Sequence, residues 1–260
     1  MLAPMGFSFA SVVLSYFLIA GGTFGAALLA GRMGIHSEYV GYIVLALGGF
    51  LGGIVAARAS KGSTIIEPAL GAVLLLASFI VVGVASSGAD AHVLLLPAGM
   101  KAIALTSAAC AGGGIAGAFV TEKLFADDTP SGASWILFVA VASFGAGVIG
   151  STFGTFLGKG ESGPLLGMLA ASCFVVGIAA GASAMTRTLG ASFLGGLVGL
   201  GAFFLLAIFV FVSVFGKGGG SAGNVPSEVY VGIGIMALGG GLATMLGSLI
   251  GWLTVGSKAA

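Results

Sequence analysis

The stretch from Ser37 to Ala57 reads SEYVGYIVLALGGFLGGIVAA and indicates a helix that crosses a membrane. Tyr39 to Ala57 contain no charged residue, and about 20 apolar residues at ~1.5 Å per residue are what a helix needs to cross a hydrocarbon core. Gly49 and Gly53 lie four residues apart, and therefore on one face, where the missing side chains let another helix come close. The stretch thus predicts both the environment of the chain and the way its helices pack.

The composition of the whole chain agrees with this interpretation. Of its 260 residues, 58% are hydrophobic and 7% are charged, whereas soluble proteins have about 25% charged residues. The mean hydropathy is +1.20. These values predict a single integral membrane domain over residues 1–260, with the lipid bilayer as its surroundings and no soluble domain. The formal net charge of +1 leaves no basic surface for a nucleic acid, so we expect no nucleic-acid partner.

Charged residues, prolines and polar clusters divide the chain into about eight candidate spans, which predicts an all-α transmembrane helix bundle. The spans are Phe9 to Ala30, Tyr39 to Ala57, Pro68 to Ala85, Ala102 to Val120, Trp135 to Leu157, Pro164 to Met185, Leu189 to Phe215 and Val229 to Val255.

Similarities between the spans predict an internal repeat of three helices. Setting Tyr39 on Trp135 also aligns Gly49 with Gly145, and Pro68 with a later proline at the same offset. A Gly-Gly-x-x-Gly pattern occurs in the first, fourth and seventh spans. The resulting units are residues 9–92, 93–186 and 187–260, a 3+3+2 arrangement in which successive units have opposite orientations, as in inverted-repeat transporters. The chain contains 49 glycines, so chance resemblance between glycine-rich helices is the alternative explanation.

Orientation is weakly encoded, because the nine Lys and Arg residues split five to four between the two sides of an eight-span chain. An even number of spans places both termini on one side, and the side with five charges predicts the cytoplasm. No Lys or Arg precedes the first apolar segment, so we expect a retained helix rather than a cleaved signal peptide. We expect the cytoplasmic (inner) membrane of a bacterium or archaeon.

Glycines at GxxxG spacing are the candidate packing residues, because helices in lipid are held together by close van der Waals contact. The residues predicted to pack helices are Gly21, Gly25, Gly49, Gly53, Gly113, Gly117, Gly150, Gly154, Gly158, Gly195, Gly199, Gly247 and Gly251. Such faces could alternatively line a narrow passage.

Glu67 precedes Pro68 at the predicted start of the third span. A carboxylate within reach of the membrane is a functional candidate, because burying it unpaired costs several kcal/mol. Thr64 and Glu67 also have the spacing of a helix capping box, and an acid is favoured at a helix N-terminus. The sequence favours capping at the membrane interface.

The candidate metal ligands are His36, Glu38, Asp90 and His92, which fall in two loops on the same predicted face. Solvated loop residues explain these side chains more simply, so we expect no metal and no cofactor. The sequence also lacks a nucleophile-base arrangement, a phosphate-binding loop and a CxxC motif.

The sequence therefore predicts a structural or accessory membrane protein. It would pack through glycine faces with itself or with a larger membrane complex, and it would not be an enzyme. The alternative is a channel or transporter for a small neutral solute or a passively conducted ion. Coupled transport is disfavoured, because every Asp and Glu maps to a loop or a helix end rather than to membrane depth.

Overall fold

The computed structural model describes residues 8–32, 38–59, 66–87, 97–125, 132–158, 161–183, 189–215 and 226–256. This part of the chain is all-helical. Its helices are α1 (Phe9–Arg32), α2 (Glu38–Ala59), α3 (Ile66–Ser87), α4 (Pro97–Phe125), α5 (Gly132–Gly158), α6 (Ser162–Ser183), α7 (Leu189–Phe215) and α8 (Ser227–Gly256).

Seven of these eight helices are long and apolar enough to cross a membrane. The apolar part of the remaining helix, α3, runs from Ile66 to Val82 and is shorter. The chain is therefore a multi-pass membrane protein. The predicted span from Leu189 to Phe215 coincides with α7, whereas α4 begins earlier than the predicted Ala102. Pro97 is the first residue of α4, a position where the missing N–H of proline has no helical partner in any case.

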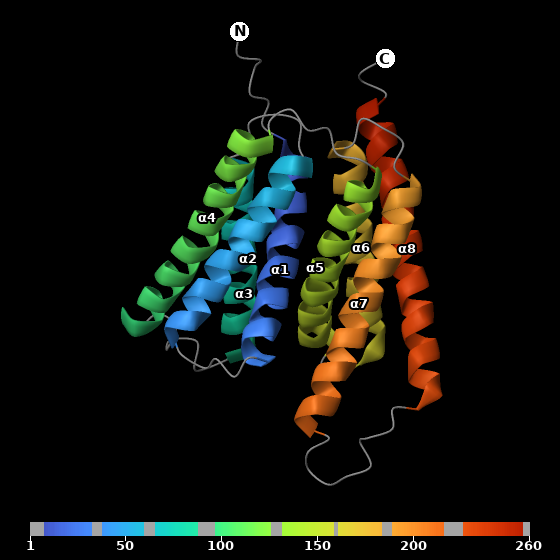
Figure 1. The fold of residues 1–260 in the computed structure, drawn as a ribbon. Helices are drawn as coiled ribbons and strands as arrows, with labels where there is room; N and C mark the ends of the chain where they lie inside the picture. The colour runs from blue at the N-terminus through green and yellow to red at the C-terminus, as the bar shows by residue number, and fades with distance from the viewer. Residues whose placement is uncertain are drawn as a thin grey trace.

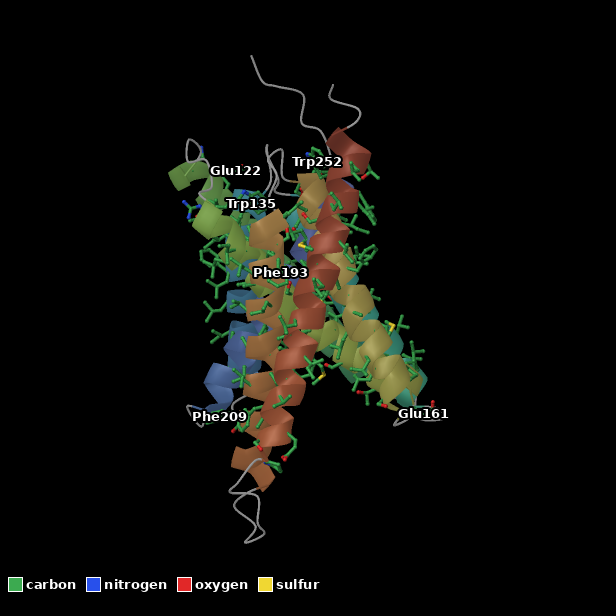
Figure 2. The ribbon with its side chains drawn as sticks, turned by 90° about the vertical axis from the view of Figure 1, so that its right-hand side faces the viewer. Glu122, Trp135, Glu161, Phe193, Phe209 and Trp252 are labelled. Atoms are coloured by element: carbon green, nitrogen blue, oxygen red, sulfur yellow. The ribbon has the colours of Figure 1, made fainter. Side chains whose placement is uncertain are left out.

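Successive helices run in opposite directions, so α1 begins and α8 ends at the same end of the bundle (Figure 1). Glu122, Trp135 and Trp252 lie toward that end, whereas Glu161 and Phe209 lie toward the other (Figure 2). Charged residues and tryptophans near the ends of membrane helices are typical anchors in the two interfacial regions.

The helices pack in two groups of four. Within the first group α1 contacts α2 and α3, and α4 contacts the same two helices; within the second group α5 contacts α6 and α7, and α8 contacts the same two. The pairs α2 with α4 and α6 with α8 have the most extensive contacts. The groups meet mainly where α1 packs against α5, and α6 also touches α1. Fully buried side chains such as Leu18, Ile19 and Val139 lie on these two central helices.

These contacts do not follow the three-helix units predicted from the sequence. In that scheme α4 and α5 correspond to α1 and α2, yet α1 and α2 pack extensively while α4 and α5 make almost no contact. Glycine-rich helices can be aligned on one another in several registers, so the resemblance between spans does not identify which helices are neighbours.

Candidate membrane-embedded site

At most of the predicted packing glycines, an added Cβ atom would meet another helix within 3.5 Å. At Gly21 it would lie 2.6 Å from the carbonyl oxygen of Val141 on α5, and at Gly154 it would lie 2.6 Å from Cα of Leu165 on α6. The same holds for Gly49, Gly53, Gly113, Gly117, Gly150, Gly158, Gly195, Gly199, Gly247 and Gly251. Gly25 differs, because a Cβ atom there would meet nothing within 4 Å.

Hydroxyl side chains in the helices mostly bond within their own helix. Ser15, Thr121 and Thr244 each donate to the carbonyl oxygen four residues earlier, at 2.7 to 2.9 Å. Such a bond satisfies the hydrogen-bonding capacity of a hydroxyl at membrane depth without a partner on a second helix. Among the described residues, the hydroxyls of Thr23, Ser143 and Ser192 are buried and have no hydrogen-bond partner.

A lateral groove of about 600 Å³ lies between the two groups of helices. We call it the membrane groove. Its walls come from α1, α2, α5 and α7, with α2 and α7 toward the viewer in Figure 1. The glycines in its lining are Gly21, Gly22, Gly25, Gly52 and Gly199, and the larger side chains are Leu18, Leu51, Val55, Phe144, Val198 and Leu206. Ala26, Ala140, Val141 and Ala202 complete the lining, so the groove contains no polar side chain.

The groove exists because the helices on either side of it do not close over the central pair. α2 makes few contacts with α5, and α7 makes almost none with α1. Leu51 and Val198, at the two rims, are each about half exposed, at 51% and 50%. Of the five glycines in the lining, the ones at positions 21, 22, 52 and 199 are packed directly against neighbouring helices, and only Gly25 faces open space. A ligand in the groove would thus meet apolar side chains along most of the walls, and it could approach the backbone of α1 closely at Gly25.

Glu67 is buried at one end of the bundle, with 3% of its surface exposed. It lies in the first turn of α3, and its Oε1 accepts a hydrogen bond from the backbone N–H of Ser8 at 3.3 Å. Ser8 immediately precedes α1, and its Oγ accepts a bond from the N–H of Ser11. The carboxylate therefore lies beside two helix N-termini, where the helix dipoles favour negative charge. Thr64, the predicted capping partner, is outside the described residues.

The candidate metal ligands cannot be brought together from the described part of the chain. His36, Asp90 and His92 lie outside the described residues, and α2 begins at Glu38, whose side chain is also not described. Among the residues that the structure describes, no three His, Cys, Asp or Glu side chains form a possible metal cluster. Cys110 and Cys173 are buried free thiols.

Several groove residues carried no signal in the sequence. Gly22 and Gly25 belong to the Gly-Gly-x-x-Gly pattern, but nothing in the sequence distinguishes Gly52, Ala140 or Ala202 from dozens of other small residues.

Comparison with known proteins found no relative of this chain. No protein-family model matches it, and no curated protein or solved structure matches it.

Proposed function

We propose that this protein is an accessory component of the membrane that binds a membrane-spanning helix of another protein in the membrane groove. The observation that carries the proposal is the groove itself, an open apolar space of about 600 Å³ in which Gly25 leaves the backbone of α1 uncovered. The partner helix would be apolar on the docking face, because the lining offers no charged or hydrogen-bonding side chain.

The lining favours a helix over a lipid chain. No hydrophobic force drives association within lipid, so an occupant must be held by close van der Waals contact. An uncovered glycine such as Gly25 permits such contact with a helix, and elsewhere in the bundle Gly49, Gly53 and Gly177 are each covered by a helix in this way. Gly25 provides the room for one large aliphatic side chain of the partner, since a Cβ there would meet open space.

The groove lining also supports a role without catalysis, because it supplies no nucleophile, acid or base. Passive conduction of a solute, the alternative, would use a polar path through the bundle, and the groove provides none along its own walls. Placement in a bacterial or archaeal inner membrane, with both termini in the cytoplasm, remains a prediction from the sequence.

Photo-crosslinking in the native membrane tests this proposal. We expect benzoylphenylalanine at Ala202, which is exposed within the groove, to form a discrete adduct with another protein. Mass spectrometry should place the link in a membrane-spanning segment of that protein. Gly25→Leu should abolish the adduct, because the leucine side chain would occupy the groove.

The matched control is Gly167→Leu in α6, an exposed glycine where an added Cβ also meets nothing within 4 Å. This variant should leave the adduct unchanged. Adducts with lipid alone, or only with a second copy of this chain, would contradict the proposal. So would a protein adduct that survives Gly25→Leu.

A further inference from the structure

We infer that the chain consists of two four-helix units in the same orientation, related by an approximate two-fold axis that runs along the contact between α1 and α5. The membrane groove is then one of two equivalent sites, and it is the one that is open. The two groups of helices already share one contact scheme, in which α1 to α4 correspond in order to α5 to α8. Four is an even number, so both units enter the membrane in the same sense.

The crossing of α2 with α4 is reproduced in the crossing of α6 with α8. Each crossing is built from four glycines, and a Cβ added to any of them would meet a carbonyl oxygen of the other helix. In the first crossing the glycine and carbonyl pairs are Gly49 with Cys110, Gly53 with Gly114, Gly113 with Ala46, and Gly117 with Phe50. In the second they are Gly177 with Thr244, Gly181 with Ser248, Gly247 with Phe174, and Gly251 with Ile178.

The residue numbers of these two crossings differ by constants. Adding 128 to each α2 number and 134 to each α4 number gives the α6 or α8 residue in all four pairs. Most of the contacting residues differ in type between the crossings, for example Ala46 against Phe174. The glycines and their register are what the two crossings share.

The contact between α1 and α5 has the reciprocity of a two-fold interface. A Cβ at Gly21 would meet the carbonyl oxygen of Val141, and a Cβ at Gly145 would meet that of Phe17. Adding 124 to the numbers of Gly21 and Phe17 gives Gly145 and Val141, so each helix offers the same positions to the other.

The same offset of 124 relates α3 to α7. Gly71 of α3 packs on Ser15 of α1, and Gly195 of α7 packs on Val139 of α5.

The two-fold relation assigns the membrane groove a counterpart on the opposite side of α1 and α5, where α3 and α6 lie (Figure 1). At the offset of 124, Ala140 and Ala202 of the groove correspond to Tyr16 and Ser78. The hydroxyl of Tyr16 donates to Oγ of Ser78 at 3.2 Å and bridges α1 and α3. Gly25 corresponds to Ile149, which is 5% exposed. At these three positions the counterpart carries the larger side chain and the groove carries alanine or glycine, and α6 packs on α1 more extensively than α2 packs on α5.

Placing the side chains of the counterpart site in the membrane groove tests whether the two sites are equivalent. The variant Ala140→Tyr with Ala202→Ser should melt at the same temperature as the parent protein or higher, because a tyrosine and a serine already pair in this geometry between α1 and α3. The control places the tyrosine out of register, as Ala142→Tyr with Ala202→Ser. Ala142 is fully buried, so this variant should melt at a lower temperature. A decrease as large for Ala140→Tyr as for the control would overturn the inference.

Disulfide formation provides a second test that does not depend on how the groove accepts a side chain. Cys110 on α4 lies against Leu45 of α2, with its Sγ 3.8 Å from the leucine carbonyl oxygen. Cys173 on α6 is in hydrogen-bond contact with Thr244 of α8, and these residues correspond to Leu45 and Cys110. With copper phenanthroline added as the oxidant that takes up the two electrons, Leu45→Cys and Thr244→Cys should therefore each form an intramolecular disulfide with the native cysteine.

Adding Cys110→Ala or Cys173→Ala, respectively, should abolish that disulfide. A disulfide in one crossing but not in the other would contradict the shared register. Neither the melting nor the disulfide measurement involves a partner protein. Failure of the photo-crosslinking experiment alone would thus count against the proposed function and not against the two-unit architecture.

Discussion

Gly21 and Gly25 are one helical turn apart on α1, yet they lie in different environments. At Gly21 the backbones of α1 and α5 are in contact, and there is no space for a methyl group. At Gly25 the helices have separated and the membrane groove begins. The same GxxxG motif thus contributes one residue to a helix interface and one to an open surface. The motif identifies a face on which close approach is possible, and the neighbouring helices decide whether it occurs.

The largest effect in this comparison is expected where a glycine faces backbone in the middle of a crossing. Gly49→Leu should strongly lower the melting temperature in detergent, because its Cβ would collide with the carbonyl oxygen of Cys110 and α2 would have to move away from α4. Overpacking of this kind costs about 1–3 kcal/mol or more. Gly177→Leu, at the equivalent position of α6, should have a similar effect, whereas Gly167→Leu should have none. Equal tolerance at all three sites would show that glycine contacts do not hold the bundle.

An intermediate effect should separate the two glycines of α1. Gly21→Ala should lower the melting temperature, since even a methyl group would lie 2.6 Å from the carbonyl oxygen of Val141. Gly25→Ala should leave it unchanged or raise it slightly, because alanine is intrinsically better than glycine in a helix by about 1 kcal/mol. Thermal unfolding of the purified protein in one detergent measures both. Destabilisation by Gly25→Ala would mean that the groove is closed.

The smallest effect is expected at the helix ends, away from both the crossings and the groove. Glu67→Gln retains an oxygen that can accept the bond from Ser8 but loses the charge that the two helix N-termini favour. We expect the free energy of unfolding to fall by a few tenths to about 1 kcal/mol.

Reconstituted in liposomes, the parent protein and the Glu67→Gln variant should both show no solute uptake driven by a pH or sodium gradient. Gradient-driven uptake that Glu67→Gln abolishes would instead make this carboxylate a coupling site.

The sequence alone determined the membrane character and most helix boundaries, because the bilayer imposes a length and a composition that can be read locally. The start and end of α7 at Leu189 and Phe215 follow from uninterrupted apolar sequence between polar segments. Glu67 was placed at the start of α3 for the same reason, since a charge followed by a proline marks the point where the apolar run begins.

The arrangement of the helices was decided only by the tertiary structure. In a soluble protein the apolar stripe of a helix points to the core, but here both the lipid-facing and the buried faces are apolar, so the direction of packing leaves little trace in the sequence. The register of α2 on α4 depends on which glycines meet which carbonyl oxygens, and many registers offer glycines. The bond from Ser8 to Glu67, 59 residues away, and the opening of the groove at Gly25 likewise depend on helices that are distant in the sequence.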